Sequence, residues 1–156
     1  MNKSAIREET FKLLYSLEIQ KDFDTEEMEV FFEDTDIKEE KVKEEIIKEI
    51  SEIKGKNDDI ISQISENLKS DWNVERISKI NIALLKIAIY EMLYKKVPYK
   101  VVINEVVELA KKYGEDTSSS FINGVLATVV KKNNLKEEMW NGGKNGVQSN
   151  YCYRFE

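Results

Sequence analysis

Histidine is absent from this chain of 156 residues, and cysteine occurs once, at Cys152. Without imidazole, the commonest general base, histidine-containing catalytic triads and the usual zinc sites are excluded. A single cysteine cannot form an internal disulfide. The 30 acidic residues are spaced as on exposed helix faces, with no pair set apart for carboxylate catalysis. The sequence therefore predicts a non-catalytic protein without a metal ion or a cofactor.

Long apolar runs are also missing. No stretch approaches the roughly 20 apolar residues of a membrane span, and the N-terminus lacks the apolar core of a signal peptide. We therefore expect a cytoplasmic protein that does not contact a membrane. The formal net charge of −6 disfavours nonspecific binding of nucleic acid over the whole surface, but it leaves room for a local basic patch.

The one proline, Pro98, separates two helical patterns within residues 74–114. The first pattern is apolar on nearly all sides, so this helix must be surrounded by other helices. The second begins at Pro98, where the missing N–H costs nothing, and has a single apolar line. It ends at Gly114, where we expect a left-handed C-terminal cap.

The N-terminal half is predicted to be helical as well. Ser4 is expected to cap a helix that runs to about residue 20, with Lys3 and Arg7 projecting together one turn apart. A solvated helix start is the simpler interpretation of these cations, although cations at this end oppose the helix dipole. Residues 22–36 carry eight acids and no base. We interpret them as a short helix with its aromatic residues inward, on a side that nucleic acid should avoid.

Three more helices complete an all-α prediction, since no strand-like alternation occurs. One is expected to begin at a capping box formed by Asp36 and Glu39 and to end at Gly55. Another begins near residue 57 and ends before Asp71. Trp72 is expected to pack beneath the turn into the central helix, the first of the two patterns within residues 74–114. The last helix begins after the polar run EDTSSS and carries Phe121 near its start.

Two positions in that last helix raise specific expectations. Gly124 lies in the helix interior, where glycine costs about 1 kcal/mol relative to alanine, so we expect a close helix contact there. Phe121 is either a core plug or an exposed stacking platform, and its position alone favours the plug. Periodicity ends near residue 133, which predicts a single compact domain over residues 1–133 and a flexible, disordered tail over residues 134–156.

Three blocks make the chain recognisable: LKIAIYEM at residues 85–92, PYKVVINEVVELAKKYG at 98–114 and FINGVL at 121–126. In this order and spacing they resemble the NusB family of bacterial transcription antitermination factors. The pairs Arg7-Glu8 and Leu14-Tyr15 add to the resemblance, which runs from about residue 4 to residue 130. A match of three blocks is far more specific than a single short motif.

The resemblance implies an all-helical fold of about seven helices and a non-catalytic role in antitermination and ribosomal RNA synthesis. The implied partners are single-stranded boxA RNA from ribosomal RNA leaders, the ribosomal protein NusE and the RNA polymerase antitermination complex. A small patch of cations and aromatic side chains suffices to bind single-stranded RNA on an acidic protein. The residues implied at the RNA are Lys3, Arg7, Phe121 and Asn123, which would meet in one patch, and those implied at NusE are Tyr15 and Asn81.

Two alternatives remain open. A NusB-like helical domain also heads certain ribosomal RNA methyltransferases, so the chain could be a module associated with an RNA-modifying enzyme. The missing strand pattern and glycine-rich cofactor loop argue against a methyltransferase domain here. The other alternative is a structural homodimer that buries Phe121 and the first helix.

Overall fold

The computed structural model describes residues 1–21, 25–69 and 71–136 of the chain. Within these ranges it contains seven α-helices and one short 3₁₀ helix and no strand, which confirms the predicted all-helical fold of about seven helices. The chain divides into two compact units, Met1–Asn57 and Asp58–Glu156. The predicted tail lies outside the described residues from residue 137 onward.

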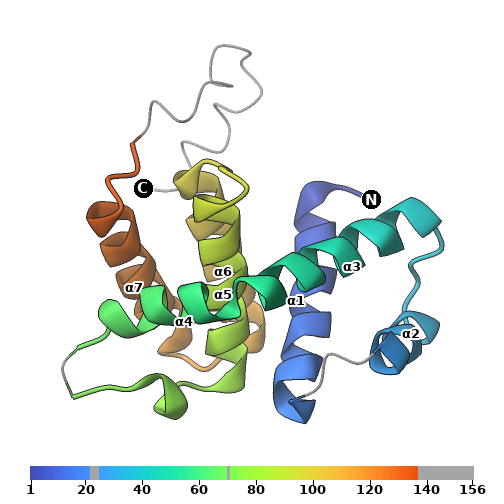
Figure 1. Cartoon of the computed structure of the whole chain (residues 1–156), viewed down its shortest axis with the longest axis horizontal. Coiled ribbons are helices and arrows are strands. Elements are labelled where there is room, and N and C mark those ends of the chain that lie inside the picture. The colour runs from blue at the N-terminus through green and yellow to red at the C-terminus, as the bar shows by residue number, and fades with distance from the viewer. Residues whose placement is uncertain (22–24, 70, 137–156) are drawn as a thin grey trace. The chain divides into compact units, whose positions relative to one another are not determined.

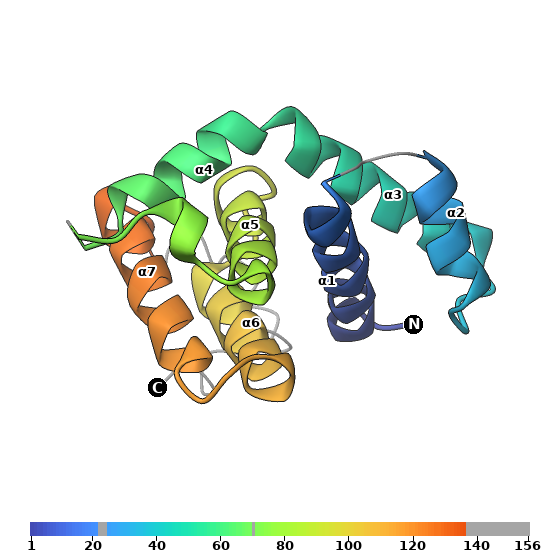
Figure 2. The same cartoon turned by 90° about the horizontal axis from the view of Figure 1, so that it is seen from below.

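The first unit holds α1 (Lys3–Gln20), α2 (Thr25–Glu33) and α3 (Glu40–Gly55). In Figure 2, α1 lies against α3, and it also contacts α2. Apolar side chains at helical spacing explain this packing, because each helix turns one stripe toward the others. The side chains that form this core are Phe11, Leu13, Leu14 and Leu17 of α1, Met28 and Phe32 of α2, and Val42, Ile46, Ile50 and Ile53 of α3.

The helix starts of this unit differ from the prediction. Asn2, not Ser4, caps α1, because its side-chain oxygen accepts a 2.8 Å hydrogen bond from the Ala5 N–H. The capping box is also wrong: α3 begins one residue after Glu39, whose side chain caps nothing. In α2 only one of the two adjacent aromatic rings is buried, that of Phe32, and the ring of Phe31 is half-buried. Both capping errors arise because several polar residues near a helix start can serve as its cap.

The second unit is built around α5 (Lys79–Leu93), which packs against α6 (Tyr99–Tyr113) and α7 (Ser118–Lys132). Figure 1 shows these three helices together, with α6 and α7 also in contact with each other. Every residue of α5 from Ile82 to Met92 is buried, as the all-round apolar pattern predicted. Ser78 caps the helix by accepting a 3.2 Å hydrogen bond from the Asn81 N–H. The remaining elements of the unit are α4 (Asn57–Glu66) and the 3₁₀ helix η1 (Val74–Arg76).

Left-handed backbone occurs at Lys21, Lys96 and Asn134 in the described part of the chain, and not at Gly114. Gly114 is extended, with φ −93° and ψ −170°, so the predicted left-handed cap is wrong. The glycine is needed for a different reason. A Cβ at this position would lie 2.6 Å from Ser118 Oγ and 2.8 Å from the Ala110 carbonyl oxygen, which is too close for a side chain.

Candidate nucleic-acid interface

The two predicted cations of α1 differ in exposure. Lys3 occupies the first helical position and is exposed. Arg7, one turn later, is only 8% exposed. Both cations lie near the positive end of the helix dipole, which repels them. The first turn of α1 contains no acidic residue to offset this repulsion. Lys3 is therefore open to a phosphate, whereas Arg7 is largely covered and cannot be treated as an ordinary surface cation.

Tyr15 is the third site residue predicted in the first unit. It is half-buried and stacks on Phe11, with ring centroids 6.1 Å apart and planes inclined at 21°. Phe11 is buried in the core of the unit. This stacking fixes the Tyr15 ring while leaving part of its surface available to a partner.

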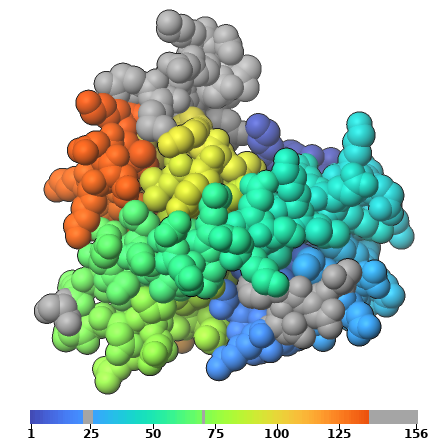
Figure 3. Space-filling view, viewed as in Figure 1, coloured from blue at the N-terminus to red at the C-terminus, as the bar shows by residue number. Residues whose placement is uncertain are grey.

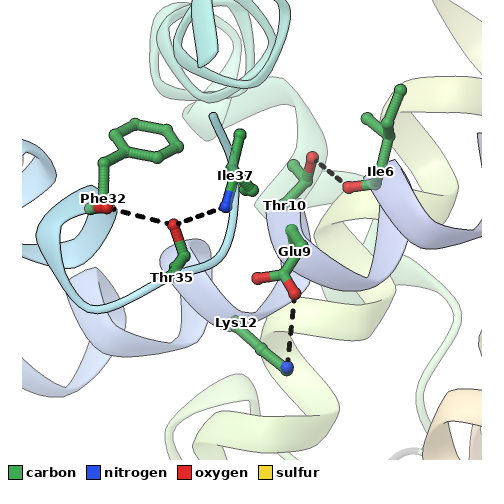
Figure 4. A network of polar contacts seen from close by, with 7 residues as sticks. All are labelled: Ile6, Glu9, Thr10, Lys12, Phe32, Thr35 and Ile37. Carbon is green, nitrogen blue, oxygen red and sulfur yellow. Dashed lines mark hydrogen bonds and ion pairs between the residues drawn. The ribbon is translucent and has the colours of Figure 1, made fainter. Parts of the chain in front are cut away.

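An acidic groove of about 780 Å³ lies on the first unit between α1, α2 and the α2–α3 loop. Figure 4 shows part of its wall, where the Thr35 hydroxyl donates to the Phe32 carbonyl (3.1 Å) and accepts from the Ile37 N–H (3.4 Å). An ion pair of 3.4 Å joins Glu9 to Lys12 at the same wall. Five carboxylates and two lysines line the groove: Glu9, Glu27, Asp34, Asp36, Glu39, Lys12 and Lys38. This excess of negative charge makes the groove unfavourable for RNA, as the acidic run suggested.

Charge is distributed unevenly between the two units. The first carries 17 acidic and ten basic residues, and the second carries 13 acidic and 14 basic residues. The net charge of −6 therefore arises in the first unit. The second unit is close to neutral, so phosphate is repelled less there.

Phe121 and Trp72 form an aromatic pair on the second unit. Their ring centroids are 5.6 Å apart and their planes are inclined at 26°, which is a stacked arrangement. Phe121 is half-buried in the first turn of α7, so it is neither the fully buried plug nor a free platform. Trp72 is 47% exposed. The prediction that it packs beneath the turn is therefore wrong, because it lies over Phe121 and in contact with solvent.

Asn123 and Gly124 follow Phe121 on α7 and are both exposed. A Cβ at Gly124 would meet no heavy atom within 4 Å, so the predicted close helix contact there is wrong. The exposed side of α7 near its start instead carries the side-chain amide of Asn123, two residues after Phe121 in the sequence. Amide groups of this kind can hydrogen-bond to base edges.

Asn81, the sixth predicted site residue, lies in the first turn of α5 and is half-buried. Its backbone N–H is held by Ser78, but its side-chain oxygen Oδ1 is buried and accepts no hydrogen bond within the described chain. A buried acceptor without a donor is costly and uncommon. Of the six predicted residues, Lys3, Arg7 and Tyr15 thus belong to the first unit, and Asn81, Phe121 and Asn123 to the second.

Trp72 is a candidate site residue that the sequence did not indicate. Its type alone does not tell whether it faces the core or solvent, since tryptophan is large and often partly buried. The only local signal is that Asn73 follows it, a residue well suited to cap the next helical turn.

A search of family models matches residues 4–131 of the chain to the NusB family. The chain belongs to the NusB family. Its match to the family runs through both units, and the prediction from the three sequence blocks is confirmed. Within residues 1–21, 25–69 and 71–136, no helix is long and apolar enough to cross a membrane.

The NusB relatives agree with this assignment. The chain is 42% identical over 132 residues to the transcription antitermination protein NusB of Acetivibrio thermocellus, covering 84% of this chain and 90% of that protein. It is 40% identical over 133 residues to NusB of Clostridium novyi, covering 84% and 99%. As a member of this non-catalytic family, the chain is a transcription antitermination protein.

Solved structures show the same fold. NusB of T. maritima superposes with a TM-score of 0.77 at 31% identity, covering 90% of this chain and 98% of that one. A structure of the antitermination factors NusB and NusE in complex with double-stranded RNA matches with a TM-score of 0.75 at 23% identity, covering 83% and 96%. At 23% identity, the similarity to this second structure supports only a shared fold.

Proposed function

We propose that this NusB-family chain binds boxA-type single-stranded RNA of ribosomal RNA leaders together with NusE, as part of the RNA polymerase antitermination complex in the cytoplasm. The observation that carries the proposal is the stacked aromatic pair Trp72–Phe121 and the exposed Asn123, which lie on the second unit, the nearly neutral part of an acidic protein. Stacking on aromatic rings is how proteins hold unpaired bases.

Lys3 and Arg7, on the first unit, are the cations that we propose to contact the RNA. Lys3 is exposed and can neutralise about one phosphate. Arg7 is largely covered, so its contribution to RNA binding would come with a role in packing α1. Two cations are few, and the rest of the first unit is acidic, so we expect weak RNA binding by this chain alone.

NusE is the proposed protein partner, with Tyr15 and Asn81 at its interface. The half-buried Tyr15 ring offers an apolar surface with a hydroxyl, and Asn81 lies half-buried in the first turn of α5. Ribosomal proteins are strongly basic, so the acidic surface of this chain attracts such a partner. A solved structure with this fold that contains NusB, NusE and RNA together lends support to such an assembly.

The test measures binding of a boxA-type RNA with and without NusE. We expect NusE to tighten RNA binding by about 1–3 kcal/mol, and RNA to tighten NusE binding by the same factor, because coupling free energies are reciprocal. A scrambled RNA of equal length and a double-stranded form serve as controls. Independent binding of the two ligands would exclude the proposed joint recognition.

Sedimentation of the same samples addresses the homodimer alternative. A monomer that binds both ligands fits the proposal. A stable dimer that binds neither RNA nor NusE would favour the structural alternative instead.

A further inference from the structure

Trp72 occupies an unusual position for a residue of its size. Tryptophan contributes a large apolar area when buried, on the order of 150–250 Å² for an aromatic side chain. Here about half of its surface stays in contact with solvent, although the neighbouring Phe121 ring covers part of it. Scattered exposed apolar residues are common and mean little alone. The stacked pair is more informative, because two aromatic rings overlap at the surface of the unit.

The backbone on both sides of Trp72 is held by hydrogen bonds. Its own N–H donates to the Lys69 carbonyl at 2.9 Å. The next residue, Asn73, caps η1 by accepting a 3.1 Å hydrogen bond from the Arg76 N–H on its side-chain oxygen. The backbone next to Trp72 is thus held by a turn before it and a capped helix after it, and the Phe121 ring packs against the indole. These contacts lower the conformational entropy that the residue would lose when a ligand stacks on it.

We propose that Trp72 is an RNA-binding residue, on which an unpaired base stacks against the indole face opposite Phe121, so that base, indole and phenyl ring form a three-layer stack. This inference rests on the proposed RNA binding and adds to it a residue outside α1 and α7. The base is accepted for its aromatic face, so the contact tolerates different bases.

Charge in this loop points to stacking and not to phosphate binding. Four charged side chains flank the indole in sequence and all are exposed: Lys69, Asp71, Glu75 and Arg76. Two are positive and two negative, so the loop offers no net attraction to phosphate. Loss of the indole should therefore lower RNA affinity without changing the salt dependence of binding, because stacking releases no counterion.

The experiment compares Trp72→Phe with Trp72→Leu in the full-length chain. Both changes keep an apolar cover over Phe121, but only phenylalanine keeps an aromatic face. We expect Trp72→Leu to weaken boxA-type RNA binding about 5- to 150-fold, the range for loss of one stacked base, and Trp72→Phe to lose much less. Both variants should unfold at similar temperatures, which separates binding from loss of packing.

Fluorescence gives an independent readout. The chain has two tryptophans, Trp72 and Trp140, so a Trp140→Phe background makes Trp72 the only tryptophan fluorophore. Saturating RNA should quench its emission as a base stacks on the indole.

Four results would overturn the inference. If the parent binds RNA and Trp72→Leu binds it equally well, or if RNA leaves Trp72 emission unchanged, Trp72 is no RNA contact and the proposed function still stands. If Trp72→Leu weakens NusE binding measured without RNA and leaves RNA binding unchanged, the pair is a protein contact. If the parent binds no RNA with or without NusE, the proposed function fails and this inference fails with it.

Discussion

Asn133 and Gln63, 70 residues apart in sequence, are joined by a 3.0 Å hydrogen bond from Asn133 Nδ2 to Gln63 Oε1. Beside it, Lys132 Nζ donates to the Glu66 carbonyl at 3.0 Å. Glu66 ends α4, and the last carbonyls of a helix have no partner within the helix. In Figure 3 the end of α7 (orange) lies against α4 (green), as these bonds require. Lys132, the last residue of α7, and Asn133, its C-cap, therefore connect α4 to the three-helix core of the second unit.

Removing this connection should lower the stability of the protein. Asn133 Nδ2 also donates to the Val129 carbonyl at 2.9 Å, so Asn133→Ala removes two hydrogen bonds. We expect it to reduce the free energy of unfolding by about 0.5–1.5 kcal/mol for each of them, the usual net value of a hydrogen bond. A double-mutant cycle with Gln63→Ala, followed by urea unfolding, isolates the pair. Lys131→Ala, a change at an exposed neighbour on the same helix, is the matched control and should have little effect. Strictly additive effects of the two changes would show that the bond contributes nothing.

Two glycines should respond in opposite directions to alanine. Gly114→Ala places a methyl group 2.6 Å from Ser118 Oγ and 2.7 Å from Ser118 Cβ, so overpacking should destabilise the protein by about 1–3 kcal/mol. Gly124→Ala meets no atom within 4 Å on an exposed helix position and should stabilise it by up to about 1 kcal/mol. Thermal unfolding of the two variants beside the parent measures both signs. A stabilising Gly114→Ala would contradict the close approach.

Alkaline unfolding should depend on Tyr94. Burial raises the pKa of this phenol above its ordinary value of 10.0, and the negative charge of Asp59 raises the pKa further. The folded protein thus holds the proton more tightly than the unfolded chain. Stability from this difference is fully present below about pH 10 and is lost as the pH rises through the folded pKa. Tyr94→Phe should therefore lose less stability than the parent above about pH 10, measured by urea unfolding at a series of pH values.

Asp59→Asn provides a partial version of the same test. It removes the smaller of the two causes, so the pKa of Tyr94 should move toward 10.0 while the effect of burial remains. A parent and a Tyr94→Phe variant with the same alkaline profile would show that Tyr94 does not titrate differently in the folded state.

Lys3 and Arg7 should differ in what their removal changes. Because Lys3 is exposed, Lys3→Ala should lower the slope of log affinity against log salt for single-stranded RNA by about 0.7 and leave unfolding unaffected. Arg7 is only 8% exposed, so Arg7→Ala should also lower the thermal stability through lost packing. The measurements are salt titrations of RNA binding and thermal scans on both variants. An unchanged salt slope in Lys3→Ala would remove this residue from the proposed site.

Strong periodic patterns in the sequence were enough to predict most of the helices. The all-round apolar pattern around Leu85 required a helix covered on all sides, and α5 is buried from Ile82 to Met92. Pro98 marked the start of α6 correctly, because its fixed φ and missing N–H suit that position. The three blocks of the NusB resemblance were enough to identify the family. These features are local or repeat along one helix, so a sequence displays them directly.

Helix caps and isolated residues were decided by the tertiary structure. Asn2 and Ser4 are both good caps, and only the path of the chain selects Asn2. A glycine can serve a left-handed turn or a close approach, and the neighbouring Ser118 shows that Gly114 serves the second. The stacking of Trp72 on Phe121 joins residues from two distant segments, so no local pattern could predict it. The sequence by itself determined the helices and the family, because periodicity and motifs can be read along the chain. The exposure of each candidate site residue was decided by the tertiary structure, because it depends on contacts that only folding creates.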